Sequence, residues 1–203
     1  QYVDDLLLCS PSRQPHLVHT AQLLNALGQW GYRVFRSKAQ IAQTQVTYMG
    51  LLLTPQQKTI PPEHLQVLTH APLPQTKREL LSLLGFLNFF RIWVLNLAFT
   101  AKPLYQATKG PLDEPILAPT WLQQPLRKLI QSLLKALSLY LPDYSKTVFL
   151  YVHANQGHAL GILCQKSGGT WSPLAYLSKQ LDMVSRGLAT LFTGFGGLCN
   201  SDT

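Results

Sequence analysis

Prolines divide this chain into segments with different local patterns, and this division limits the folds that it can adopt. The 203 residues include 14 prolines, and three of these fall with a glycine inside residues 109–120. Because proline interrupts helices and central strands, such a segment is typical of a linker between domains. Strand-like runs dominate before Pro55, helical patterns follow as far as the linker, and both types occur after it. Strands and helices that are segregated along the chain favour an α+β fold.

The first 54 residues are expected to form a strand, a helix and two further strands. Apolar residues recur at helical spacing over 16–30, and Gly31 stands where a C-terminal cap belongs. Short runs of apolar, aromatic or β-branched residues predict the strands, whose expected ranges are 2–9, 32–35 and 46–53.

Residues 55–108 are expected to form three helices. The middle one has the clearest start, because Thr76 and Glu79 match a capping box, in which each side chain accepts a hydrogen bond from the other residue's backbone N–H. The helix is therefore predicted to begin at Lys77. The first helix is expected over 62–69, with Pro62 in its first turn. The third is expected over 97–108, bent or restarted at Pro103.

Residues 121–187 are expected to combine one helix with an antiparallel meander. Apolar residues from Leu126 to Leu137 recur at helical spacing, with polar and basic residues opposite. Glycines separate three β-type runs, which are expected over 147–153, 158–166 and 171–177. Residues 188–203 are rich in glycine, nearly uncharged and without a regular pattern.

The charge balance favours a polyanionic partner. The chain has 17 Lys and Arg against 9 Asp and Glu, which gives a net charge of +8. No run of four cations occurs, so a broad basic surface fits better than a localisation signal. Three widely spaced cysteines without a CxxC pair favour a reducing compartment, and no membrane span or secretory leader is recognisable. We therefore expect a cytoplasmic location and no membrane partner.

Asp4 and Asp5 stand out because carboxylates are rarely buried without a partner, yet this pair lies in an apolar run. One interpretation is a turn that directs both carboxylates toward Mg²⁺, which prefers oxygen ligands. Two such ions, about 3.5–4 Å apart, clamp the attacking and leaving oxygens of a phosphoryl transfer. The other interpretation is an ordinary turn with solvated acids.

The segment Gln1-Tyr-Val-Asp-Asp-Leu-Leu-Leu8 resembles the active-site turn of retroviral reverse transcriptases. In order and spacing, the rest of the chain to about residue 187 resembles the enzyme of the gammaretroviral type. Its lysine-bearing segment and primer-grip hairpin resemble Lys38-Ala-Gln-Ile41 and Val46-Thr-Tyr-Met-Gly-Leu-Leu-Leu53. Its thumb resembles Pro72-Leu-Pro-Gln-Thr-Lys-Arg-Glu-Leu80, Phe90-Arg-Ile92 and Lys102-Pro-Leu-Tyr105. Its connection domain resembles Leu141-Pro-Asp143, Gln165 and Leu174-Ala-Tyr-Leu-Ser-Lys179.

The resemblance implies a domain order. A C-terminal palm remnant is expected over 1–54, a helical thumb over 55–108 and an RNase H-like connection domain over 121–187, with the linker at 109–120 and a divergent tail at 188–203. The implied function is that of a fragment of an RNA-directed DNA polymerase from an endogenous retroviral Pol polyprotein, with the RNase H domain further downstream. The alternatives are a non-catalytic nucleic-acid-binding module and a decayed genomic remnant.

The resemblance also implies roles for individual residues. Asp4 and Asp5 match the paired metal-binding aspartates, and Lys38 matches a proton donor to the leaving pyrophosphate. Tyr2 and Val3 match residues that lie beside the primer end and the incoming nucleotide. The primer grip is matched by Tyr48, Met49 and Gly50. Ordinary alternatives exist, since Lys38 also fits a solvated charge at a strand edge, and the hairpin residues also fit simple packing.

One departure from the family bears on activity. The family holds its two Mg²⁺ ions with a third aspartate on an earlier strand, and this chain begins after it, so we expect no polymerase activity from the chain alone and dNTP binding only if upstream residues complete it. The partner that remains is a primer–template duplex, whose phosphates are expected to contact Lys77, Arg78 and Arg91. A solvated helix start is the alternative for the first two.

A nuclease site is not expected in this chain. The RNase H chemistry needs an acidic cluster that begins with an aspartate on the first strand of its domain, where this chain has His153. We expect His153 and His158 to be surface residues of a hairpin rather than metal ligands.

Overall fold

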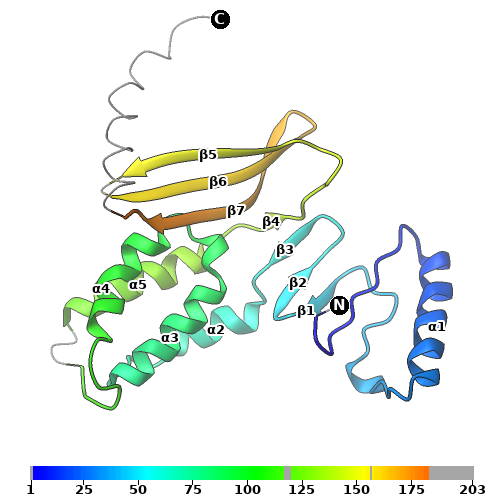
Figure 1. Cartoon of the computed structure of the whole chain (residues 1–203), viewed down its shortest axis with the longest axis horizontal. Coiled ribbons are helices and arrows are strands. Elements are labelled where there is room, and N and C mark those ends of the chain that lie inside the picture. Colours follow the sequence, from blue (N-terminus) through cyan, green and yellow to red (C-terminus); the bar gives the residue numbers. More distant parts are fainter. Residues whose placement is uncertain (1, 117–119, 156, 183–203) are drawn as a thin grey trace, which may run out of the picture. The chain divides into compact units, whose positions relative to one another are not determined.

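The computed structural model describes residues 2–116, 120–155 and 157–182, and these fall into two compact units. Unit 1 runs from Gln1 to Pro61, and unit 2 begins at Pro62. Each unit mixes helices with antiparallel strands, in agreement with the predicted α+β class (Figure 1). None of the helices in the described ranges is both long and apolar enough to cross a membrane.

Unit 1 holds one long helix and a small sheet. Helix α1 spans Arg13–Gln29, close to the predicted range, and ends in a Schellman motif. In that motif the N–H of Tyr32 donates to the carbonyl of Leu27, and Gly31 adopts a φ of +82°, which glycine tolerates without strain. The sheet has the antiparallel order β1-β2-β3, formed by Val46–Tyr48, Leu51–Leu53 and Gln57–Thr59.

Two predicted strands of unit 1 are wrong. Residues 6–10 have no regular structure, and residues 32–35 lead irregularly into a short 3-10 helix at Arg36–Lys38. A strand requires a hydrogen-bonded neighbour, and no described strand pairs with either segment. The third predicted strand, over 46–53, is a hairpin of two short strands, as the resemblance implied.

Unit 1 has little core of its own. Helix α1 has no buried residue, and its predicted apolar stripe is partly exposed at Leu17 and Leu24. Leu6 and Leu7 are exposed as well, and 69% of the Phe35 surface is accessible. Among the described residues of unit 1, burial is confined to Ile60 and Pro61. The apolar pattern of this unit is therefore not matched by apolar partners within it.

Unit 2 begins with four helices that share a leucine-rich core. Helices α2 (Pro62–His70), α3 (Lys77–Phe89) and α4 (Leu97–Ala107) match the predicted thumb helices, and α5 (Thr120–Leu134) matches the predicted helix of the next segment. Helix α4 continues through Pro103 instead of restarting there. The core that the four helices share consists largely of leucines and includes two aromatic residues. Its members are Leu68, Leu80, Leu84, Leu87, Phe90, Trp93, Leu104, Leu129 and Leu133.

The predicted capping box is present. The Thr76 hydroxyl accepts a hydrogen bond from the backbone N–H of Glu79 at 3.2 Å, and the Glu79 carboxylate accepts from the N–H groups of Thr76 and Gln75 at 3.4 and 2.8 Å. These bonds satisfy donors that a helix start otherwise leaves unpaired, so α3 begins at Lys77 as predicted.

Residues 109–116, within the predicted linker, are hydrogen-bonded to the start of α3. The N–H of Arg78 donates to the carbonyl of Leu112 at 2.8 Å, and the N–H of Ile116 donates to the carbonyl of Gln75 at 2.9 Å. The segment therefore folds back onto the start of α3. Its prolines exclude a helix or a central strand, but they leave the remaining N–H and carbonyl groups free to pair with another part of the chain.

The second half of unit 2 is the predicted antiparallel meander, with order β5-β6-β7. Its strands are Val148–Asn155, His158–Ser167 and Thr170–Gln180, and a two-residue strand β4 (Leu139–Tyr140), which was not predicted, lies near β7. In Figure 1, β7 is the strand nearest to helices α4 and α5, and β5 is the far edge of the sheet. Strand β5 is exposed on both faces over most of its length.

Helix α4 and strand β7 are joined by a hydrogen bond as well as by packing. The hydroxyl of Ser178 in β7 accepts from the backbone N–H of Ala98, in the first turn of α4, at 3.0 Å. The residue that precedes the helix, Asn96, makes no side-chain cap. A residue 80 positions later thus accepts a hydrogen bond from an N–H group that the helix start leaves unpaired. The predicted thumb helix and the predicted connection sheet therefore belong to the same unit.

Candidate nucleic-acid interface

The Tyr2–Asp5 segment forms a tight turn. The N–H of Tyr2 donates to the carbonyl of Asp5 at 2.9 Å, and the N–H of Asp5 donates to the carbonyl of Tyr2 at 2.8 Å. Val3, at the corner, has a φ of +48°, which is uncommon and costly for a β-branched residue. Asp4 and Asp5 are both exposed, and no ion pair joins them to a lysine or arginine of the described ranges. The turn therefore presents two unpaired carboxylates to solvent.

Two carboxylates supply ligands of the right kind for Mg²⁺, but fewer than a two-ion site requires. Within the described residues, no group of three or more His, Cys, Asp or Glu side chains is placed to hold a metal. Each hard cation needs about six oxygen ligands, and two ions share bridging carboxylates in such sites. The described residues therefore supply two of the carboxylates that a two-ion site needs.

The predicted primer-grip residues lie at the tip of the β1-β2 hairpin. Tyr48 pairs with Leu51 across the strands, so the loop consists of Met49 and Gly50 alone. Both have positive φ, +50° and +71°, as a type I′ turn requires. Gly50 adopts this conformation freely, whereas Met49 does so at a cost. Met49 is also partly exposed, so its side chain is available at the tip.

Lys38 lies at the end of the 3-10 helix, with its ammonium 5.8 Å from the centre of the Phe35 ring. Both residues are exposed, and a cation over an aromatic face is weakly stabilised at such a site. The structure thus groups the predicted residues of unit 1 into three places, which are the aspartate turn, the hairpin tip and the 3-10 helix.

The first two predicted phosphate contacts are already engaged by carboxylates. The ammonium of Lys77 forms an ion pair with Glu114, and the guanidinium of Arg78 forms a bidentate pair with Asp113 at 2.9 and 3.2 Å. The hydrogen bonds from Arg78, and then its charge, lower the pKa of the Asp113 carboxyl, and Asp113 raises the pKa of Arg78 in the same way. Arg91, beyond the other end of α3, is exposed without a carboxylate partner among the described residues.

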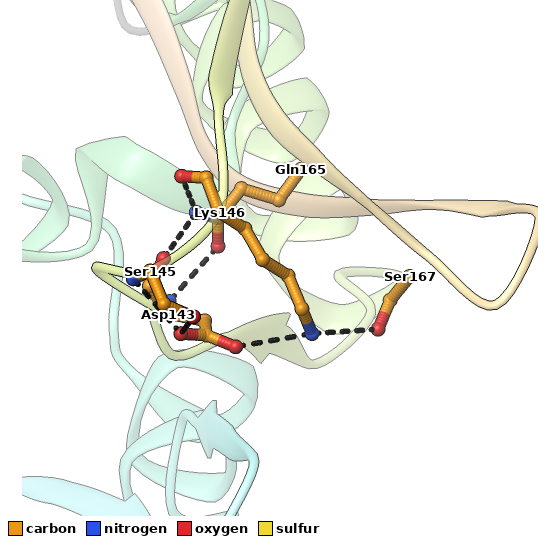
Figure 2. A network of polar contacts seen from close by, with 5 residues as sticks. All are labelled: Asp143, Ser145, Lys146, Gln165 and Ser167. Atoms are coloured by element: carbon orange, nitrogen blue, oxygen red, sulfur yellow. Dashed lines mark hydrogen bonds and ion pairs between the residues drawn. The ribbon is translucent and has the colours of Figure 1, made fainter.

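A buried glutamine holds the loop that precedes the meander (Figure 2). The amide oxygen of Gln165 accepts from the N–H of Asp143 at 2.9 Å, and its amide nitrogen donates to the carbonyls of Asp143 and Lys146 at 2.7 and 3.1 Å. Ser145 and Lys146 both contact the Asp143 carboxylate, and the Ser145 hydroxyl, at 2.6 Å, is the largest cause of its pKa of about 2. This network stabilises the loop.

The two histidines differ in their surroundings. His153 is exposed, as expected. His158 is 2% exposed, so its predicted surface position is wrong. Its ring forms a T-shaped contact with the ring of Phe99 in α4, and the two ring centres are 5.3 Å apart. A hairpin residue is buried here because α4 packs against the sheet, a contact that the sequence does not reveal.

The chain is similar in sequence to polyproteins of retroviruses. It is 42% identical over 191 residues to the Pol polyprotein of feline endogenous virus ECE1, and this match covers 92% of the chain. It is 41% identical to the Gag-Pol polyprotein of baboon endogenous virus and 38% identical to that of gibbon ape leukemia virus, over 92% and 94% of the chain. The matches span 18%, 11% and 11% of these relatives. No protein-family model matches the chain.

The fold is similar to that of solved retroviral enzymes. The foamy viral protease-reverse transcriptase in complex with an RNA/DNA hybrid has a TM-score of 0.77 at 22% identity, over 93% of this chain and 26% of that one. The same enzyme in complex with dsDNA has a TM-score of 0.74 at 23% identity, over 90% of this chain and 39% of that one. Over nearly all of its length, the chain is therefore similar in sequence to a segment of retroviral Pol polyproteins, and its fold is similar to that of part of the foamy viral protease-reverse transcriptase.

Proposed function

We propose that this chain forms part of an RNA-directed DNA polymerase, and that by itself it binds a primer–template duplex without extending the primer. The observation that carries the proposal is the Tyr2–Asp5 turn, which exposes two carboxylates that form no ion pair with the described lysines and arginines. The similarity in fold to an enzyme described in complex with RNA/DNA hybrid and with dsDNA supports the same partner for this chain.

In this proposal, Asp4 and Asp5 are metal ligands that need at least one further carboxylate to hold two Mg²⁺ ions. Tyr2 and Val3 lie beside the primer end and the incoming nucleotide. The hairpin residues Tyr48, Met49 and Gly50 support the primer, and Lys38 donates a proton to the leaving pyrophosphate once a dNTP is bound. The dNTP site requires residues outside this chain, and the place of action is the cytoplasm.

Primer extension tests the catalytic half of the proposal. The full chain is incubated with a labelled primer on an RNA template, dNTPs, and Mg²⁺ or Mn²⁺. We expect no extension, because two carboxylates do not fix two metal ions for in-line transfer. Template-dependent extension that Asp4→Asn abolishes would show that the chain completes its own site.

A duplex-binding titration tests the other half. A net charge of +8 favours a non-catalytic binding module as the second candidate function, and both candidates require binding to a duplex at low salt. The absence of binding at about 50 mM salt would exclude both. Binding without extension supports the chain as a duplex-binding segment, whichever protein it works in.

A further inference from the structure

We infer that the exposed face of helix α5 is a phosphate-binding surface for a nucleic-acid duplex. This inference rests on the proposed function and assigns it a site. The basic face is defined here as Gln123, Gln124, Arg127, Lys128, Gln131 and Lys135. Five of these residues, all but Lys135, line a surface hollow of about 380 Å³.

The helix separates its two faces sharply. Leu122, Leu126, Leu129 and Leu133 are buried, each 6% exposed or less. The basic face lies opposite, and Arg127, Lys128 and Lys135 are exposed. Because buried leucines fix the rotation of the helix, the three cations are held on one side of it. The basic face is therefore a preformed feature of unit 2.

In the described part of the chain, no ion pair neutralises the charge on this face. No acidic residue occurs between Glu114 and Asp143. Among the described residues, none of the ion pairs involves Arg127, Lys128 or Lys135. The cations that the sequence first assigned to phosphates, Lys77 and Arg78, are instead paired with carboxylates. A paired cation must lose its partner before it binds a phosphate, so the unpaired face of α5 has the lower cost of binding.

The polar residues between the cations fit the same partner. Gln123, Gln124 and Gln131 carry amide N–H donors, which contact phosphate oxygens without reading the base sequence. Lys135 directly follows the last residue of α5, and its N–H still donates to the carbonyl of Gln131 as in a helical turn. Arg127 and Lys135 are therefore separated by about 12 Å along the helix axis. At a rise of about 3.4 Å per nucleotide, this length matches three to four phosphates of one strand. The site therefore takes a nucleic-acid backbone rather than a single anion.

The experiment compares two variants of the full chain that lose the same charge. The first is Arg127→Gln with Lys128→Gln and Lys135→Gln. The matched control is Lys109→Gln with Lys166→Gln and Lys179→Gln, three exposed lysines elsewhere in unit 2. Binding of a fluorescent RNA/DNA hybrid is measured by anisotropy from about 50 to 200 mM salt, and circular dichroism melting checks that both variants fold.

The expected result is a change in the salt dependence of binding. If each cation on α5 neutralises one phosphate, the slope of log affinity against log salt becomes less steep by about 2.7 in the first variant. Over a fourfold rise in salt, this variant then loses about 40-fold less affinity than the native chain does. The control should keep nearly the native slope, and the hybrid sequence should not matter.

Each other outcome has a defined meaning. If the native chain binds the hybrid and both variants change equally, only overall charge acts, and the α5 site is wrong while the proposed function stands. If the native chain does not bind the hybrid at about 50 mM salt, the proposed function fails. Vesicles that contain phosphatidylserine serve as a second probe. If the first variant loses vesicle binding but keeps hybrid binding, the face is a membrane surface and the inference is overturned.

Discussion

Replacement of Gln165 by glutamate should destabilise unit 2 in a pH-dependent way. Glutamate has nearly the same shape as glutamine, so the change tests hydrogen bonding rather than packing. One oxygen still accepts from the N–H of Asp143. The other replaces an amide nitrogen that donates to the carbonyls of Asp143 and Lys146 at 2.7 and 3.1 Å. At neutral pH, a carboxylate oxygen then faces two carbonyl oxygens.

The expected loss of stability follows from these contacts. Each buried acceptor that loses its donor costs about 1–3 kcal/mol. Both carbonyls lie in a partly exposed loop, where water replaces some of the loss. The two together therefore lower the free energy of unfolding by about 2–4 kcal/mol at pH 7. For a chain of this size, about 3 kcal/mol lowers the melting temperature by roughly 6–12 °C.

The sign of the pH effect is fixed by protonation. In the folded Gln165→Glu variant, burial and the facing carbonyls should raise the pKa of the introduced carboxyl above its unfolded value of about 4.3, because only the protonated acid donates a hydrogen bond. The folded state then binds the proton more tightly, so the penalty shrinks as the pH falls from 7 to 4. Asp143, with a pKa of about 2, stays ionised in the folded native chain over this range. Its unfolded form begins to take up protons near pH 4 in the native chain and in the variant alike, so the variant is compared with the native chain at each pH.

Urea unfolding, followed by tryptophan fluorescence at pH 7 and pH 4, measures this effect. The control is Gln180→Glu, at an exposed position at the end of β7. Three results would refute the reasoning: a loss no larger than that of the control, a loss that is the same at both pH values, or a loss that grows as the pH falls.

Three further changes test other parts of the structure. Ser178→Ala removes the acceptor for the N–H of Ala98 and should lower stability by about 1 kcal/mol in urea unfolding, whereas Ser178→Thr, which keeps the hydroxyl, should lose less. Met49→Asn places a residue that tolerates positive φ in the type I′ turn and should slow amide hydrogen exchange in β1 and β2. Faster exchange would contradict the inference that Met49 is strained there. The stabilisation from the ionised Asp143 carboxylate is present above its unfolded pKa of about 3.9 and is lost as the pH falls toward 2, so Asp143→Asn should flatten the acid-unfolding curve there.

Local signals predicted the helices well. The capping box at Thr76 placed the start of α3 correctly because both partners lie within four residues. The apolar stripe of α5 was predicted correctly because the buried residues recur at helical spacing within the helix itself. The meander was predicted from glycines between β-type runs, and its register then follows from antiparallel pairing, as between Leu150 and Leu163.

The errors arose where structure depends on distant residues. The run at 32–35 has strand composition but no strand beside it, and His158 is buried by a helix that lies far away in the sequence. The phosphate contacts expected of Lys77 and Arg78 stay a prediction. The ion pairs of these two residues bridge 37 and 35 positions, so no local pattern indicated those pairs. The absence of acids around α5 and its basic side were both visible in the sequence, and the structure adds that none of the ion pairs among the described residues involves the cations of that side.

The hydrogen bond between Ala98 and Ser178 has a consequence for synthesis of the chain on the ribosome. Translation at about 5–20 residues per second separates these two positions by about 4–16 s. During this interval helices α4 and α5 are made while β7, which packs against α4, does not yet exist. The face of α4 that β7 later covers is exposed to solvent until then. Unit 2 therefore completes its fold only after nearly all of its described residues have been made.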